Sequence, residues 1–305
     1  MSPTLVLIVY CILIVAASLF GGWLPSLVRL THTRLQLMMS CVGGLMLGIA
    51  IFHLLPHAVN AQVSLDRALI WLMGGLLTTF FLIRVFHSHQ HAPLEESEEE
   101  CHDHSHDHSH DHAASGGKHR WIGVFVGLSL HTLLDGAALG AAVLSDYEHT
   151  PHMLLFGLAV FLGVVLHKPL DSLSIATLMA GGGWELRARQ FVNLAYATMC
   201  PVGAALFFFG VRGSAQQDLI VGCSLAFASG IFLCISMGDL LPELEFHAHD
   251  RIKLTAALLV GVALAYGIGF LEPAHVHSHS GTAESAHHDH TGHDHTGHDH
   301  AGHDH

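Results

Sequence analysis

Eight long apolar segments constrain this chain more than any other feature of its sequence. A helix that crosses a hydrocarbon layer of roughly 30 Å needs about 20 apolar residues, because peptide groups without hydrogen-bond partners cannot face lipid. Eight segments meet this requirement, at about residues 5–24, 36–57, 66–86, 121–144, 153–178, 191–211, 219–241 and 254–271. The sequence therefore predicts an all-α polytopic membrane protein, a bundle of eight transmembrane helices in a lipid bilayer.

The composition agrees with this class. Hydrophobic residues make up 51% of the 305 residues and charged residues 12%, about half the charged fraction of an ordinary soluble domain. The 12 lysines and arginines are too few and too scattered for a nucleic-acid footprint. The six cysteines form no CxxC pair and, with one exception, lie in apolar segments, where they are expected to act as small apolar residues.

The basic residues predict an orientation. If the N-terminus lies outside, nine bases fall in cytosolic loops: Arg29, Arg34, Arg84, Lys118, Arg120, Arg187, Arg189, Arg251 and Lys253. Only Arg67 and Arg212 fall in external loops. Cytosolic loops carry the excess of positive charge. We therefore expect a multi-pass protein of the cell membrane, plasma or inner, with both termini outside.

Two polar segments rich in histidine divide the chain. Residues 1–86 hold spans one to three, 87–119 a cytosolic loop with ten histidines, 120–272 spans four to eight, and 273–305 a tail that repeats "GHDH". Neither polar segment has the apolar periodicity needed to bury a core, so both are expected to be disordered. Alternating His and Asp predict weak, multivalent metal binding by these segments.

Two matched motifs lie within spans four and five. These are "HTLLD", from His131 to Asp135, and "HKPLD", from His167 to Asp171. Residues four apart share one face of a helix, and a short loop makes the two spans antiparallel neighbours. Two imidazoles and two carboxylates at similar depth suit tetrahedral Zn²⁺, and the same ligands accept Fe²⁺, Mn²⁺ or Cd²⁺ with less preference.

The energetic cost of these residues supports a metal site. Asp135, Asp171 and Lys168 together would cost about 8–10 kcal/mol at mid-bilayer if each stood alone. A bound cation, mutual pairing or a wet cavity must offset this cost. Lys168 is either a structural counter-ion or a fixed cation in the place of a second metal ion; a role in carrying a proton is the remaining alternative.

Other residues could line a route for metal. His53 and His57 in "HLLPH" share a face at the external end of span two. Asp239 and Glu243 in "DLLPE" are four apart at the cytosolic end of span seven, where a solvated carboxylate pair is the alternative. Cys200 could add a thiolate, although an apolar cysteine is usually inert packing.

These residues together resemble the ZIP (Zrt/Irt-like protein) family of divalent-metal transporters over nearly the whole chain. "HTLLDG" is similar to the family's span-four motif, and "HKPLDS" is less similar to its span-five motif; "HLLPH" and "LLPEL" match the ends of spans two and seven. The resemblance implies an inverted repeat of spans 1–3 and 6–8 around spans 4–5, a homodimer, and metal import into the cytosol.

Departures from the family pattern are informative. Members with two adjacent metal ions have an Asn, acids and a Glu where this chain has Thr132, Lys168 and Cys200. The resemblance therefore implies that one metal site is kept and the second is altered.

Three alternatives stay open. A cation diffusion facilitator, which exports metal, also uses HxxxD pairs but has six spans. A membrane metal sensor or buffer would bind metal without moving it. An intramembrane hydrolase would need a motif such as HExxH, which is absent, so we expect a transporter and not an enzyme.

Overall fold

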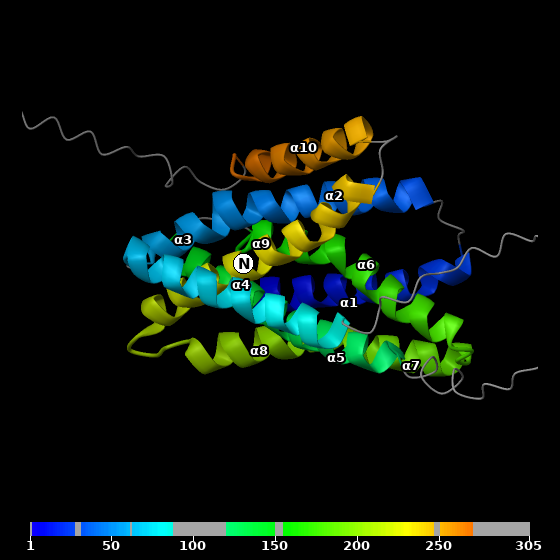
Figure 1. The fold of residues 1–305 in the computed structure, drawn as a ribbon. Coiled ribbons are helices and arrows are strands. Elements are labelled where there is room, and N and C mark those ends of the chain that lie inside the picture. The colour runs from blue at the N-terminus through cyan, green and yellow to red at the C-terminus, as the bar shows by residue number, and fades with distance from the viewer. Residues whose placement is uncertain are drawn as a thin grey trace, which may run out of the picture. The chain divides into compact units, whose positions relative to one another are not determined.

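A computed structural model of the chain describes residues 2–27, 32–61, 63–87, 120–149, 155–246 and 251–270, all within one compact unit, Met1–Ala274. The His-rich segments at 88–119 and 275–305 lie outside the described residues. Every regular element in the described part is a helix, and the helices lie along one another in a bundle (Figure 1). Eight of the helical stretches are long and apolar enough to cross a membrane, which confirms the predicted number.

The spans follow the chain in order. The first is α1 (Pro3–Leu27), and the second is built from α2 (His32–Ile49), the π-helix η1 (Ala50–Leu54) and α3 (Leu55–Asn60). The next three are α4 (Leu65–His87), α5 (Arg120–His149) and α6 (Leu158–Gly181). The sixth combines α7 (Leu186–Ala197) and α8 (Met199–Val211), followed by α9 (Gln217–Phe246) and α10 (Arg251–Ile268).

Local sequence explains the irregular points in these spans. Pro56 follows η1 and has no N–H to continue the regular ladder, so the backbone widens into a π-turn before it. Pro201 similarly lies just after Thr198, where α7 and α8 meet. The predicted start of span five at residue 153 was too early. Gly157 has a left-handed φ of 68°, and the helix begins at Leu158.

Glycines let the most extensively packed helix pairs approach closely. These pairs are α2 with α10, α5 with α8, α4 with α9 and α1 with α6. A Cβ on Gly44, Gly75 or Gly136 would overlap a carbonyl oxygen of the facing helix. Since lipid is as apolar as these side chains, van der Waals packing of close backbones must hold the helices together.

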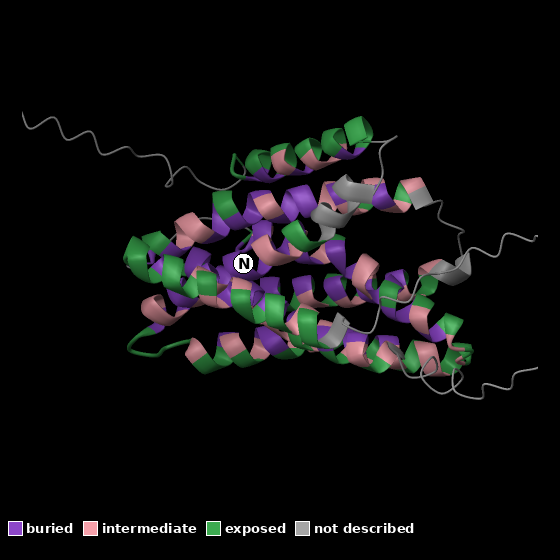
Figure 2. Ribbon diagram, in the orientation of Figure 1, coloured by how far each residue is buried: buried purple, intermediate pink, exposed green. Residues whose placement is uncertain are grey.

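The burial pattern is that of a membrane bundle. Buried residues line the interior and exposed residues face outward (Figure 2). Many exposed residues are large and apolar, among them Ile70, Leu206 and Phe209. Polar side chains lie instead at the centre, where α5 and α6 bury His131, Thr132, Asp135, His167 and Lys168. The fold thus places its hydrophilic groups in the layer that lipid would otherwise make most costly.

Candidate metal centre

Three side chains of types that bind metal ions converge at the bundle centre. His131 and Asp135 lie one turn apart on α5, and His167 comes from α6. Asp135 Oδ2 is 3.3 Å from His131 Nε2 and 3.2 Å from His167 Nε2. The ligand atoms of this group all lie within 4.8 Å of one another, and all three residues are buried. Among the described residues, this is the group of three or more potential ligands that could hold a metal ion.

A hydrogen bond to the backbone determines which ring nitrogen of His167 carries the hydrogen in the neutral imidazole. Its Nδ1 lies 2.8 Å from the carbonyl oxygen of Gly163, one turn earlier on α6. A carbonyl only accepts, so Nδ1 carries the hydrogen and Nε2 presents its lone pair in the neutral ring. In metal sites, a hydrogen bond from the ring nitrogen that does not face the metal holds the imidazole in its orientation. His167 Nε2 is therefore aimed at the space shared with Asp135.

Two polar atoms of the cluster lack hydrogen-bond partners within the described part of the chain, Asp135 Oδ1 and His131 Nδ1. A buried polar atom without a partner usually carries a free-energy penalty of about 1–3 kcal/mol. A divalent cation bound at the cluster could use this free oxygen of a carboxylate whose Oδ2 already lies next to two imidazoles. Zinc bonds of about 2.0–2.2 Å in a tetrahedron put neighbouring ligand atoms roughly 3.3 Å apart, which agrees with the spacing seen here.

Lys168 contacts the same oxygen of Asp135 as the two imidazoles. Its Nζ is 2.9 Å from Asp135 Oδ2 and donates to Thr132 Oγ1 at 2.8 Å, and the side chain is inaccessible to solvent. The ammonium therefore offsets the charge of Asp135 directly. The Thr132 hydroxyl is therefore a hydrogen-bond partner of Lys168.

Asp171, predicted as the fourth ligand, lies at the edge of the cluster. Its Oδ2 is 3.7 Å from His167 Nε2 and 3.5 Å from Lys168 Nζ. Its side chain is 18% exposed, whereas that of Asp135 is fully buried. The same oxygen accepts a hydrogen bond of 2.9 Å from the hydroxyl of Tyr196.

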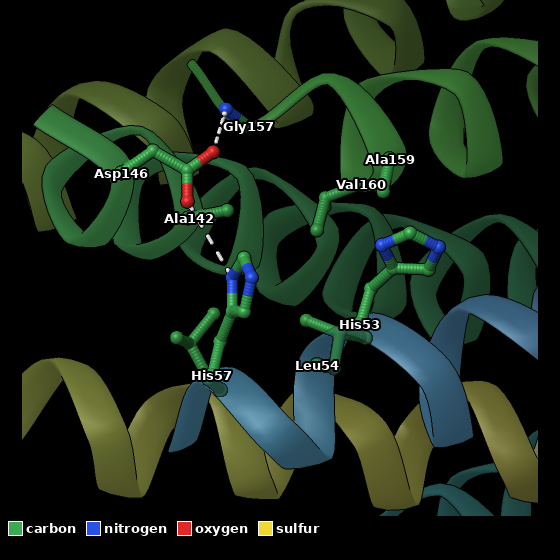
Figure 3. Close-up of a pocket in the computed structure, with 9 residues that line it drawn as sticks. His53, Leu54, His57, Ala142, Asp146, Gly157, Ala159 and Val160 are labelled. Atoms are coloured by element: carbon green, nitrogen blue, oxygen red, sulfur yellow. Dashed lines mark hydrogen bonds and ion pairs between the residues drawn. The ribbon is translucent and has the colours of Figure 1, made fainter. Parts of the chain in front are cut away.

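The two histidines of span two lie in a separate place. Figure 3 shows His53 of η1 and His57 of α3 lining a cavity with Asp146 of α5. His57 Nδ1 is 3.4 Å from Asp146 Oδ1, and Asp146 Oδ2 accepts from the Gly157 N–H at 2.7 Å. His53 Nε2 donates to the Ala265 carbonyl at 2.8 Å. The cavity volume of about 10 Å³ is room for one water molecule.

Cys200 does not join either group. Cys200 is buried in α8, with its carbonyl against Gly136, and its thiol is not one of the converging ligand atoms of the described cluster. Asp239 and Glu243 belong to α9, but their side chains lie outside the described part of the structure.

Sequence reasoning missed two residues that contact these sites. Asp146 lies 11 residues after Asp135, which is three helical turns and so the same face of α5; this spacing could have revealed it. Tyr196 lies one turn before Cys200 in span six. A tyrosine inside an apolar segment is the signal that could have indicated it, because its hydroxyl needs a partner when buried.

An eight-span bundle with a buried His/Asp cluster defines a polytopic membrane protein with a candidate metal site inside its transmembrane layer. Comparison with known families is consistent with this class. The family described as "ZIP Zinc transporter" matches residues 4–269, and the chain belongs to this family.

Individual relatives are distant but cover much of the chain. The chain is 24% identical to zinc transporter ZIP9 of Xenopus tropicalis over 255 residues, which is 76% of this chain and 82% of the relative. It is 26% identical to zinc transporter foi of Drosophila melanogaster over 170 residues, 55% of this chain and 22% of that protein. Human metal cation symporter ZIP8 is 26% identical over 124 residues, 41% of this chain and 24% of the relative.

Proposed function

We propose that this protein moves Zn²⁺ across the cell membrane into the cytosol, and that the ion binds during passage between His131, Asp135 and His167, with Asp171 as the fourth ligand. The observation that carries the proposal is a buried cluster in which three potential ligand atoms converge. Asp135 Oδ2 lies 3.3 Å from His131 Nε2 and 3.2 Å from His167 Nε2. Zinc transport by the family supports zinc over Fe²⁺, Mn²⁺ or Cd²⁺ as the main substrate.

We assign Lys168 the role of a fixed cation. Its Nζ contacts Asp135 and Thr132 at 2.9 and 2.8 Å, so it occupies the space beside the candidate site that a second ion would need. One metal ion then binds per cluster. Two positive charges so close would repel strongly in a medium of low dielectric constant.

The route has two ends in this proposal. With both termini outside, His53, His57 and Asp146 lie at the outer end of the bundle. The ion leaves past Asp171, which is partly exposed and one turn nearer the cytosolic end of α6 than His167, and then past Asp239 and Glu243.

Alternating access is proposed, and close packing of α6 next to the cluster supports it. Gly163 packs between Ile49 of α2 and Phe232 of α9, and a Cβ placed on it would be 3.0 and 3.2 Å from their side chains. We infer that helices shift before an ion passes from the outer cavity to the cluster. An inverted repeat is supported by the packing: exchanging spans 1–3 with 6–8, and 4 with 5, converts α1–α6 into α8–α5 and α2–α10 into α9–α4.

A flux assay with purified protein in liposomes that hold a zinc dye tests the function. We expect the wild-type protein to deliver zinc to the lumen, and Asp135→Ala and His167→Ala to abolish delivery, because each removes a ligand from the cluster. A variant in which a Gly/Ser linker replaces residues 88–119 and residues 275–305 are removed should keep most of the flux, since no residue of the buried cluster lies in these segments.

Two further measurements, zinc binding by the purified protein and efflux from preloaded cells, separate the alternatives. Zinc binding without flux would indicate a membrane sensor or buffer, and outward movement from preloaded cells would indicate an exporter. Normal flux in Asp135→Ala would remove the proposed site.

A further inference from the structure

Tyr196, near the end of α7, joins two parts of the candidate metal centre. Its side chain has no exposed surface, and its hydroxyl lies between Thr132 of α5 and Asp171 of α6. Thr132 Oγ1 is 2.8 Å from the hydroxyl oxygen, and Asp171 Oδ2 is 2.9 Å from it. The ring also lies against the Lys168 ammonium, 5.5 Å from Nζ to the ring centroid. One residue thus connects three helices at the site.

The direction of these hydrogen bonds is determined by the groups themselves. The Lys168 ammonium can only donate, so Thr132 Oγ1 accepts from it at 2.8 Å. Thr132 then gives its own hydrogen to the Tyr196 oxygen. Tyr196 in turn donates its hydrogen to Asp171, because a carboxylate accepts only. The chain of donors that starts at Lys168 therefore ends on Asp171.

The oxygen that Tyr196 contacts is the one nearest the metal cluster. Asp171 Oδ2 is 3.7 Å from His167 Nε2, longer than the roughly 3.3 Å between neighbouring ligands of tetrahedral zinc. Asp171 lies outside the group whose ligand atoms are all within 4.8 Å of one another, so it would move a short way inward to bind the ion. A carboxylate oxygen has lone pairs for both a hydrogen bond and a metal. In metal sites the ligating carboxylates are commonly held by such outer contacts, whose loss typically reduces metal affinity 10–100-fold.

We propose that Tyr196 is a positioning residue that holds Asp171 Oδ2 in place as the fourth ligand of a divalent cation bound to His131, Asp135 and His167. This inference rests on the proposed function, because it assumes that the cluster binds the transported ion. It adds a residue from span six, outside both HxxxD motifs, to the determinants of zinc affinity.

Tyr196→Phe tests the inference, because it removes the hydroxyl and keeps the ring beside Lys168. In the full-length protein in zinc-dye liposomes, we expect the KM for zinc to rise about 10–100-fold. Tyr10→Phe is the matched control, since Tyr10 is also buried but stacks on Phe161 in α1 and α6. Its KM should equal that of the wild type.

A double-mutant cycle shows whether Tyr196 acts through Asp171. Asp171→Ala should raise KM by at least as much, and adding Tyr196→Phe to it should change KM no further. If the rise in KM of the double variant equals the product of the two single rises, Tyr196 acts independently of Asp171. That result would overturn the inference. If Tyr196→Phe fails to fold, Thr132→Val provides the test. It removes the hydroxyl that orients Tyr196, so we expect the KM for zinc to rise. An unchanged KM would overturn the inference.

Failure of this inference can be told apart from failure of the proposed function. No zinc flux in the wild type, or full flux in Asp135→Ala, would contradict the function itself. Flux that depends on Asp135 but has the same KM with or without the Tyr196 hydroxyl would contradict only the role of Tyr196.

Discussion

At the scale of single residues, the candidate metal centre buries charged groups whose individual free-energy costs of burial are offset by their pairing. Asp135 Oδ2 lies 2.9 to 3.3 Å from one ammonium and two imidazoles, all buried. Removing one partner of a buried ion pair leaves the other charge without compensation, which is more harmful than removing both. In the proposed site, the stability of the protein and its metal affinity therefore depend on the same carboxylate, and variants must be chosen to separate them.

Asp135→Ala is expected to destabilise the protein by up to about 3–5 kcal/mol. It removes the nearer of the two carboxylates that pair with buried Lys168 and leaves only Asp171, at 3.5 Å. The double variant Asp135→Ala with Lys168→Met should recover most of this loss, although it still cannot bind zinc at the cluster. Chemical unfolding in detergent measures both. Equal destabilisation of the single and double variants would show that the Asp135–Lys168 pair contributes little.

Lys168→Glu should allow a second metal ion to bind. The change replaces a fixed positive charge, 3.5 Å from Asp171, with another carboxylate ligand. Elemental analysis of the full-length protein after dialysis against a weak chelator should give one more zinc per chain than the wild type. Lys168→Gln is the control, since it removes the charge without adding a carboxylate. A zinc content unchanged from wild type in folded Lys168→Glu argues against the fixed-cation role.

At the scale of helices, close packing between α4 and α9 depends on one glycine of an adjacent pair. A Cβ on Gly75 would overlap the carbonyl oxygen of Phe227, whereas a Cβ on Gly74 would meet only the Phe227 ring, at 3.8 Å. The same side chain added at neighbouring positions therefore has different consequences.

Gly75→Ala is expected to cost about 1–3 kcal/mol through forced separation of the two helices. Gly74→Ala should be close to neutral, because its methyl group would make an ordinary van der Waals contact. Thermal unfolding of the two purified variants in detergent tests the difference. Similar unfolding temperatures would mean that α4 and α9 adjust at little cost.

At the scale of the whole molecule, the orientation remains a prediction from the distribution of basic residues. Single cysteines at Arg67 and Arg212 should react with a membrane-impermeant maleimide on intact cells, in a background without the six native cysteines. Cysteines at Arg187 and Lys253 should react only after permeabilisation. All four positions are exposed, so burial does not limit labelling. The reverse labelling pattern would invert the topology and the proposed direction of transport.

Much of the fold and part of the site could be predicted from the sequence, for identifiable reasons. Span length is set by the thickness of the bilayer, so eight apolar segments predict eight spans whatever their packing. The i, i+4 spacing places His131 and Asp135 on one face of α5 in any regular helix. Local irregularities were less predictable: the glycine at 157 moves the start of α6 by several residues from the apolar boundary.

The sequence alone determined the class, the spans and the helices that carry the candidate metal ligands, because these follow from local chemistry and helical periodicity. Only the tertiary structure decided which faces of α5, α6 and α7 meet. Uniformly apolar flanks do not fix the rotation of a helix about its axis, and packing against neighbours does. That rotation brings His167 to Asp135, Asp146 to His57, and the Tyr196 hydroxyl to Asp171.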